Sequence, residues 1–171
     1  FFDDPKRTRN NHLYWVGLAV TAAGVATNDR ALFDWGMGVY REALAQIAAD
    51  GTLPLEMARR SRAVHYHNFA LAPLVMIAEL GTANGIALYA EADGALHRLA
   101  ARSVSGMMDA SYFERAAGTK QEPPPRGGEL AWAEPYLKRF PDAALPQAWK
   151  ERIAHARPVT YPRLGGNLSA L

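Results

Sequence analysis

The sequence predicts an all-α fold, and three observations support this prediction. Apolar residues make up 49% of the 171 residues, and alanine supplies much of that fraction, which favours helix over strand. Val, Ile and Thr rarely occur in the runs that are typical of strands. Apolar residues recur at helical spacing in several long segments that short turn signals separate. We therefore expect a single all-α domain over residues 1–171.

Four long helices are expected, and each is bounded by turn signals such as Asn-Asp, Asp-Gly or Asn-Gly pairs. The expected spans are 11–27, then 29–49 with Asp29 as the cap, a helix from Glu56 or Ser61 to 81 that contains Pro73, and 86–108. At least four helices should exceed ten residues, and no sheet should have three or more strands. Short turns between long helices favour antiparallel hairpins, as in a bundle, a solenoid or part of an α/α toroid. No fixed-period repeat is present, which disfavours the common solenoids.

The last third of the chain is expected to be less regular. Residues 118–128 contain three consecutive prolines and should form a loop. Two shorter helices are expected over 129–140 and 146–156, before an irregular tail over 158–171 in which Gly165-Gly166 indicates a tight turn. Four large side chains fit either a sugar-binding groove or a closed core: Trp132, Glu134, Tyr136 and Trp149.

The composition disfavours several classes of protein. The formal net charge of +2 is too small to indicate a nucleic-acid-binding protein. No membrane helix is expected, and without cysteine there is no disulfide or thiolate metal site. The chain begins without Met and without a signal pattern, so we expect a mature or truncated product. Two basic clusters suit either an anionic ligand or solvated helix ends: Lys6, Arg7 and Arg9, then Arg59, Arg60 and Arg62.

The first candidate motif stands at the start of the first helix. It combines two amides, an imidazole and two aromatic rings within six residues: Asn10, Asn11, His12, Tyr14 and Trp15. Amide and imidazole groups can hydrogen-bond a carboxylate, and aromatic rings can stack on the apolar face of a sugar. The alternative is a helix cap followed by a surface histidine.

The second candidate motif precedes and opens the third helix. If the segment is helical throughout, Arg59, Arg62 and Tyr66 share one face. Two guanidiniums beside a phenol would favour its ionised form, which suits a tyrosine that acts as a base near neutral pH. A half-buried packing role for Tyr66, with arginines at the rim, fits equally well. His65 and His67 point apart on a helix and have no carboxylate at ligand spacing, so no metal site is expected.

Four motifs occur in an order that resembles the periplasmic alginate lyases of polysaccharide lyase family five. They are Asn10-Asn11-His12-Leu13-Tyr14-Trp15, Arg62-Ala63-Val64-His65-Tyr66-His67-Asn68-Phe69-Ala70 with Pro73-Leu74-Val75-Met76-Ile77-Ala78, Ala131-Trp132-Ala133-Glu134-Pro135-Tyr136, and Arg163-Leu164-Gly165-Gly166. The resemblance covers residues 7–166. It implies an incomplete α/α toroid of antiparallel helical hairpins, poly(β-D-mannuronate) lyase activity in alginate catabolism, no metal or other cofactor, and a periplasmic location. It also implies that the chain is the C-terminal, catalytic half of such an enzyme, with the N-terminal half absent.

The resemblance also implies roles for particular residues. The catalytic candidates are Asn11, His12, Arg59 and Tyr66. The candidates for substrate binding are Asn10, Trp15, Arg62 and His65. Of these, His65 is expected to support the residues that contact the substrate rather than to contact it directly. The family has a polar residue where this chain has Leu13, so position 13 is not expected to contact the substrate. The implied partner is an acidic polysaccharide, with neither nucleic acid nor membrane, and the oligomeric state stays open.

The chemistry of these residue types fits β-elimination on a 4-linked uronate. The C6 carboxylate must be neutralised, a base must remove the C5 proton, and an acid must protonate the departing O4. Asn11 and Arg59 suit the carboxylate, His12 can assist or act as the base, and Tyr66 suits the acid. In mannuronate the C5 proton and O4 lie on the same side of the ring, so one tyrosinate could serve both; guluronate would require two groups. The division between His12 and Tyr66 therefore depends on the substrate.

Two other functions fit the same residues. One is a lyase that acts on another acidic glycan, such as a glycosaminoglycan or glucuronan. The other is a non-catalytic helical module that binds polyanionic sugars. A glycoside hydrolase is disfavoured, because no pair of carboxylates stands out in the motifs.

Overall fold

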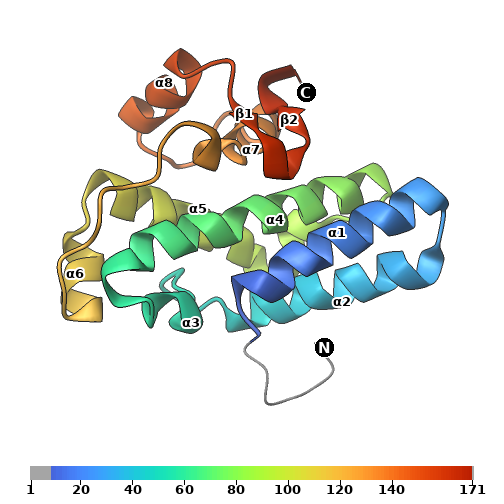
Figure 1. Cartoon of the computed structure of the whole chain (residues 1–171), viewed down its shortest axis with the longest axis horizontal. Coiled ribbons are helices and arrows are strands. Elements are labelled where there is room, and N and C mark those ends of the chain that lie inside the picture. The colour runs from blue at the N-terminus through green and yellow to red at the C-terminus, as the bar shows by residue number, and fades with distance from the viewer. Residues whose placement is uncertain (1–8, 171) are drawn as a thin grey trace.

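A computed structural model describes residues 9–170 of the chain, so Lys6 and Arg7 lie outside the described residues. Four long helices form the body of this part: α1 (Asn11–Thr27), α2 (Arg30–Gln46), α4 (Ala63–Ala83) and α5 (Glu91–Met108). Figure 1 shows α1 and α2 as one hairpin, α4 and α5 as a second hairpin beside it, and the C-terminal segments across one side. The predicted all-α fold and the four long helices are confirmed.

The shorter elements connect and cover the two hairpins. They are α3 (Pro54–Met57), α6 (Ser111–Ala117), α7 (Ala133–Arg139), α8 (Gln147–His155), and five 3-10 helices at Arg60–Arg62, Leu88–Ala90, Gly127–Leu130, Pro162–Leu164 and Leu168–Ala170. The strands β1 (Thr160–Tyr161) and β2 (Gly166–Asn167) pair antiparallel, in the register Thr160 with Asn167 and Tyr161 with Gly166. Within residues 9–170 this sheet has two strands, in agreement with the prediction that no sheet has three or more.

Local caps and small residues explain the α1–α2 hairpin. Asn28 ends α1 in the left-handed conformation (φ 54°), and Oδ1 of Asp29 accepts hydrogen bonds from the first N–H groups of α2 at 2.9 and 3.1 Å. The two helices then approach closely, since a Cβ on Gly36 would lie 1.9 Å from Oγ1 of Thr21. Glycine at position 36 is what allows α1 and α2 to pack at this distance.

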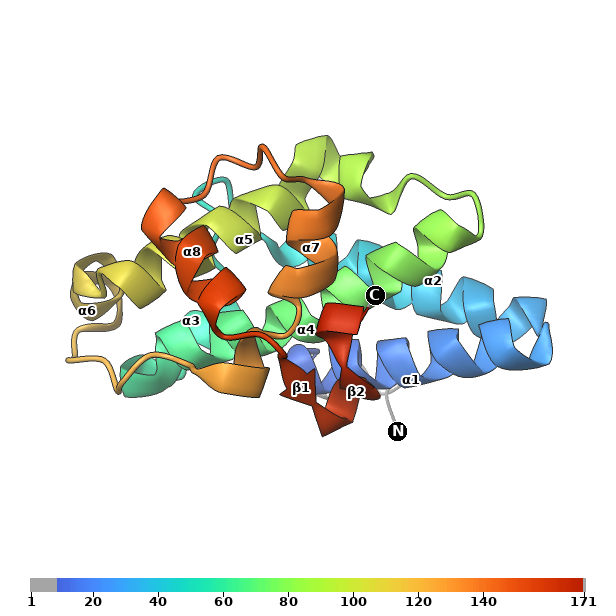
Figure 2. The same cartoon turned by 90° about the horizontal axis from the view of Figure 1, so that it is seen from above.

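Helix α4 is the central element of the fold. It contacts α1, α2 and α5, and most of its side chains are buried, including those around Pro73. Because α1 and α4 lie side by side in both views (Figures 1 and 2), the first turn of α1 stands beside the first turns of α4. This arrangement brings together the two candidate motifs.

Two expected helices differ from the structure at their N-terminal ends. The segment before α4 is not one continuous helix, because Arg60 adopts a left-handed conformation (φ 56°) between α3 and the 3-10 turn that follows. Of the two starts left open for this helix, Glu56 and Ser61, the second is closer to the observed start at Ala63. The condition that the segment is helical throughout is not met. The helix expected to begin at 129 begins instead at Ala133, after a 3-10 turn that Oε2 of Glu129 caps by accepting from the N–H of Arg126.

Two further helix boundaries differ from the prediction. Helix α2 ends at Gln46 rather than near 49, because Ile47 is extended and a turn follows it. The fourth helix begins at Glu91 rather than 86, after a 3-10 turn, and contains a left-handed stretch at Ala92–Gly94.

The large side chains of the last third close the core. Trp132 and Trp149 are fully buried and stack with ring centroids 5.6 Å apart, and Tyr136 is also buried. Glu134 is buried and binds Arg157, with Oε2 3.0 Å from a guanidinium nitrogen. Of the two interpretations left open for these residues, the closed core is the one that the structure supports. Within residues 9–170, none of the helices is long and apolar enough to cross a membrane.

Candidate functional site

A polar pocket of about 320 Å³ lies where the start of α1, the first turns of α4 and the C-terminal tail meet. Its lining residues carry imidazole, guanidinium, carboxylate and aromatic groups: His12, Arg62, His65, Tyr66, Phe69, Glu129, Tyr161 and Arg163. Four of these were predicted from the sequence, two as catalytic residues and two as substrate contacts. The arrangement joins segments that are far apart along the chain.

Tyr66 stands between two arginines. The guanidinium carbon of Arg59 lies 4.7 Å from the centre of the Tyr66 ring, and that of Arg62 lies 4.9 Å from it. The three side chains therefore meet as predicted, although the backbone before α4 is a pair of short turns rather than one helix. The Tyr66 hydroxyl has no hydrogen-bond partner within residues 9–170, so it is available to a ligand.

His12 and Tyr66 line the same pocket, as predicted, because α1 and α4 lie side by side. Arg59 does not line the pocket; it contacts the Tyr66 ring and the carboxylate of Glu56 instead, with Nε 3.7 Å from Oε2. The pocket thus presents His12 and Tyr66 directly, and Arg59 supports Tyr66.

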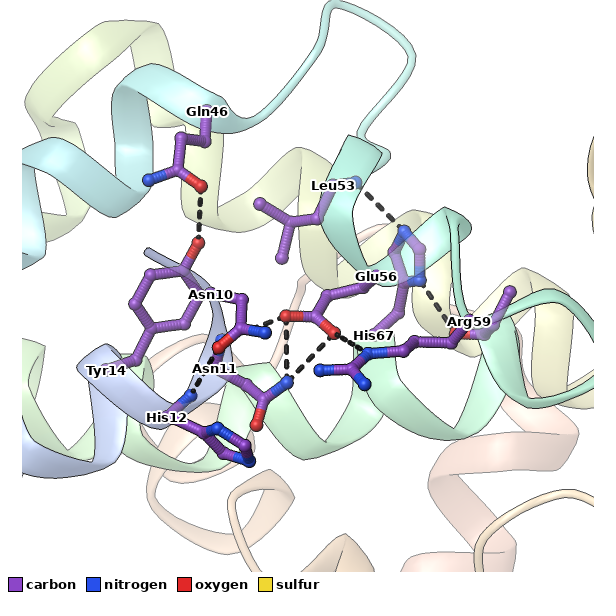
Figure 3. A network of polar contacts seen from close by, with 10 residues as sticks. Asn10, Asn11, His12, Tyr14, Gln46, Leu53, Glu56, Arg59 and His67 are labelled. Atoms are coloured by element: carbon purple, nitrogen blue, oxygen red, sulfur yellow. Dashed lines mark hydrogen bonds and ion pairs between the residues drawn. The ribbon is translucent and has the colours of Figure 1, made fainter. Parts of the chain in front are cut away.

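The two asparagines lie at the start of α1, next to His12 (Figure 3). Oδ1 of Asn10 caps the helix by accepting from the N–H of His12 at 3.1 Å. Asn11 is fully buried; its backbone N–H and its Nδ2 donate to Oε1 of Glu56, and Nδ2 also donates to Oε2, all at 2.9 Å. The amide nitrogen of Asn11 is therefore already occupied, and neither asparagine lines the pocket.

Glu56 is a buried carboxylate that the sequence did not single out as a site residue. Its side chain is 0% exposed, so burial raises its pKa, against the opposing effects of the Asn11 hydrogen bonds and the Arg59 charge. A glutamate just after Pro54 resembles an ordinary helix-start residue in the sequence. Its partner Asn11 lies 45 positions away, so only the tertiary structure identifies its role.

The two histidines of the second motif have different surroundings. His65 lines the pocket, and its Nε2 lies 3.3 Å from Oε1 of Glu129. His67 is buried, with Nδ1 2.8 Å from the carbonyl oxygen of Ala63 and Nε2 accepting from the N–H of Leu53 at 2.9 Å. Burial lowers the pKa of His67 to about 4. Among residues 9–170, no group of three or more His, Asp or Glu side chains is arranged to hold a metal ion.

Four pocket residues were not predicted as site residues, and the C-terminal segments supply three of them. Glu129 is held in place because Nδ2 of Asn68 donates to its carbonyl oxygen at 2.9 Å. Tyr161 and Arg163 precede the tight turn at Gly165-Gly166, where φ is 91° and 118°. The sequence had indicated that turn but not what it carries into the pocket.

The fourth is Phe69, which joins the pocket to Trp15. The guanidinium carbon of Arg163 lies 5.4 Å from the Phe69 ring, and the Trp15 ring lies 5.2 Å from the same ring. Trp15 lines an adjacent pocket of about 310 Å³ that also includes Arg163. The predicted contact residue Trp15 thus lies beside the polar pocket rather than inside it.

The charges in the pocket favour an anionic ligand. Arg62 and Arg163 are fixed cations, His12 and His65 can carry further positive charge, and Glu129 is the one carboxylate among the lining residues. Aromatic rings beside them offer flat apolar faces of the kind that contact sugars. Fold and site together define a protein of paired helical hairpins with a cationic, aromatic-lined pocket.

Comparison with known proteins identifies the family. The family model described as alginate lyase matches residues 2–113, and the chain therefore belongs to the alginate lyase family. It is 46% identical over 172 aligned residues to a polysaccharide lyase of Stenotrophomonas maltophilia and covers 50% of that protein. It is 40% identical to an alginate lyase of Azotobacter vinelandii, covering 45% of it, and 42% identical to one of Pseudomonas syringae, covering 43%. These alignments include 100%, 99% and 96% of this chain.

Solved structures support the same assignment. The chain matches alginate lyase A1-III from Sphingomonas species A1 with a TM-score of 0.82 and 32% sequence identity, over 95% of this chain and 46% of that one. A tyrosine-to-phenylalanine variant of A1-III in complex with a tetrasaccharide matches with the same TM-score. The expected α/α toroid is confirmed as the fold to which these hairpins belong. The chain spans about half the length of the curated relatives it matches, which is consistent with the expected C-terminal half.

Proposed function

We propose that this chain supplies the catalytic half of a lyase that cleaves mannuronate-rich alginate by β-elimination. Membership of the alginate lyase family supports the reaction class. The observation that carries the proposal is the pairing of His12 with a Tyr66 that two guanidiniums flank, in one cationic pocket. The term intact enzyme is used below for the protein at the full length of its relatives, of which this chain is one half.

The proposed reaction uses the pocket residues as follows. Cationic side chains neutralise the C6 carboxylate of the uronate, which makes the C5 proton acidic. A base, Tyr66 as tyrosinate or His12, takes that proton. The electron pair left at C5 forms the C4–C5 double bond while the C4–O4 bond breaks, and Tyr66 gives a proton to O4. One product carries the departed O4 as a new reducing end, and the other carries the unsaturated uronate at its nonreducing end.

Two variant structures of one relative support the choice of His12 and Tyr66. Alginate lyase A1-III has been crystallised with a tetrasaccharide as a tyrosine-to-phenylalanine variant and as a histidine-to-alanine variant. In that protein's numbering, the replaced histidine precedes the replaced tyrosine by as many positions as His12 precedes Tyr66 here. The same spacing in a protein of the same fold supports the same two roles.

Asn11 can contact the substrate carboxylate directly only under one structural condition. Its Nδ2 donates to both oxygens of Glu56, so it can reach a substrate carboxylate only if the amide turns away from Glu56 or shares its protons. Arg62 and Arg163 line the pocket directly, and Arg62 also lies near Glu122, with its Nε 3.5 Å from Oε2 of that carboxylate. We therefore assign the ground-state contact with the C6 carboxylate first to these two arginines, with Asn11 and Arg59 acting from behind the pocket.

Products formed from a panel of polysaccharides test the proposed function. The intact enzyme is incubated with polymannuronate, polyguluronate, glucuronan and hyaluronan, and unsaturated uronates are followed by their near-ultraviolet absorbance. We expect product from polymannuronate at the highest rate. Product from glucuronan or hyaluronan alone would indicate a lyase for another acidic glycan. Binding of polymannuronate without product from any polymer would indicate a non-catalytic sugar-binding module.

We further propose a periplasmic location and a role in alginate catabolism, because the motifs resemble those of periplasmic alginate lyases. Fractionation of the source cells tests the location. The protein should appear with periplasmic marker enzymes, and its recovery with cytoplasmic markers would contradict the proposal.

A further inference from the structure

Glu56 is a fully buried carboxylate next to the proposed site, and the reaction described above does not use it. Its side chain is 0% exposed. Its three hydrogen bonds all come from Asn11, at 2.9 Å each, and Arg59 lies 3.7 Å away. Every partner is a donor, which fits a carboxylate that only accepts. An unpaired buried carboxylate would be costly, so these partners stabilise Glu56, and Glu56 in turn fixes their positions.

The two partners of Glu56 stand next to the two residues on which the proposed reaction depends. Asn11 immediately precedes His12 at the start of α1, and Arg59 lies against the ring of Tyr66. Figure 3 shows the Glu56 carboxylate between Asn11 and Arg59, with His12 below it and His67 to one side. One carboxylate therefore connects the segment that carries His12 to the arginine that supports Tyr66.

Glu56 itself is held by the backbone around it. Its short helix α3 begins after Leu53, whose N–H donates to the buried His67 of α4. This contact connects α3 to the helix that carries Tyr66. The backbone that carries the Glu56 carboxylate is thus held in place. A positioning residue needs this, because small displacements of catalytic groups reduce turnover strongly.

The charge of Glu56 has a second effect. It lies beside Arg59 and close enough to His12 for the two charges to interact. A negative charge behind the pocket weakens the attraction between these cations and a polyuronate in the ground state. Glu56 therefore lowers the affinity of the pocket for the substrate while it fixes the positions of Asn11 and Arg59.

We propose that Glu56 is a positioning residue that orients Asn11 and Arg59 around His12 and Tyr66 and moderates the cationic charge of the pocket. This inference rests on the proposed lyase function. It makes a prediction that a merely structural glutamate does not: removing its charge should separate turnover from substrate affinity.

The test uses two substitutions at position 56 of the intact enzyme, Glu56→Gln and Glu56→Asp. Glu56→Gln keeps the shape but loses the charge, so we expect kcat to fall by about 10- to 100-fold while KM falls by about 3-fold or more. Glu56→Asp keeps the charge but shortens the reach, so kcat should fall while KM stays unchanged. The control is Glu79→Gln, because Glu79 also pairs with an arginine, Arg139, but lines no part of the polar pocket.

A second measurement separates this inference from the proposed function. Calorimetry measures the affinity for an oligomannuronate of intact enzyme that also carries Tyr66→Phe. There Glu56→Gln should tighten binding by about 3-fold or more, and Glu56→Asp and Glu79→Gln should leave it unchanged. Unchanged kcat in Glu56→Gln, or weaker binding in both position-56 variants, would overturn the positioning role. If the unsubstituted enzyme makes no product, the lyase function fails and the binding measurements still decide the role of Glu56. Absence of binding by every form would overturn both proposals.

Discussion

The stability of the region behind the site should depend on pH through His67. Its Nε2 accepts from the N–H of Leu53 at 2.9 Å, and this requires the imidazole nitrogen to carry no proton. Nδ1 is committed to the carbonyl oxygen of Ala63 at 2.8 Å. Burial lowers the pKa of His67 to about 4. Protonation of His67 would therefore break the contact that anchors α3 and Glu56.

The size and sign of the effect follow from this pKa. In the unfolded chain the pKa of histidine is about 6.5, so the unfolded state takes up the proton first as the pH falls. The folded state loses stability from about pH 6.5 down to the folded pKa of about 4, and the loss is absent above that window. At pH 5 the loss should be about 2 kcal/mol, since one pKa unit corresponds to about 1.4 kcal/mol.

Denaturant unfolding of the wild type and of His67→Gln, at pH 7.5 and at pH 5, measures this loss. At the higher pH the variant should be less stable by about 1–3 kcal/mol, because its hydrogen bonds to Leu53 and Ala63 are weakened or lost. At the lower pH the difference should shrink by about 2 kcal/mol, since only the wild type has the titrating imidazole. A stability difference that stays constant between the two pH values would refute the reasoning.

Three further outcomes are expected. Gly36→Ala would place a Cβ 1.9 Å from Oγ1 of Thr21 and should lower the free energy of unfolding by about 1–3 kcal/mol. Gly38→Ala, with nothing within 4 Å of the added Cβ, should raise the free energy of unfolding by about 0.4–1 kcal/mol. Equal melting temperatures of the two variants would contradict the packing of α1 on α2. Asn68→Ala leaves Nε1 of the buried Trp132 and a backbone carbonyl unpaired, so denaturant unfolding should show a loss of about 2–4 kcal/mol, and a loss below about 0.5 kcal/mol would contradict these contacts. The 171-residue chain by itself should show little or no lyase activity and a tendency to associate, because its relatives are about twice as long; a fully active monomer in sedimentation would be the contrary result.

The sequence predicted best those features that depend on neighbouring residues. The end of α1 and the start of α2 follow from Asn28 and Asp29, which act within a few positions of themselves. The meeting of Arg59, Arg62 and Tyr66 was also predicted, although the helix assumed for it does not exist at Arg59. The left-handed Arg60 carries no turn signal of its own, so that break was not visible in the sequence.

The rest of the site depends on contacts between distant segments. Glu129 and Arg163 reach the pocket because the C-terminal segments lie across α1 and α4, which no local pattern indicates. Asn11 looked like a residue facing a ligand, but its amide nitrogen is held by Glu56, 45 positions away. The sequence therefore identified the residue types of the site correctly, and the tertiary structure decides which of them line the pocket.

The hydroxyl of Tyr66 is the group on which the proposed lyase function depends most directly. Tyr66→Phe in the intact enzyme removes that hydroxyl and leaves the ring between Arg59 and Arg62. A matched control is Tyr89→Phe, which removes a hydroxyl that donates to Glu79 at 2.7 Å, away from the polar pocket.

Turnover of polymannuronate, measured beside the melting temperature of each variant, decides the question. Tyr66→Phe should lower kcat by about 10³-fold or more with KM little changed, and its melting temperature should stay close to that of the wild type. Tyr89→Phe should turn over normally and lose about 1 kcal/mol of stability. Normal turnover by Tyr66→Phe, with a stability loss like that of the control, would contradict a catalytic Tyr66 and leave it as a packing residue.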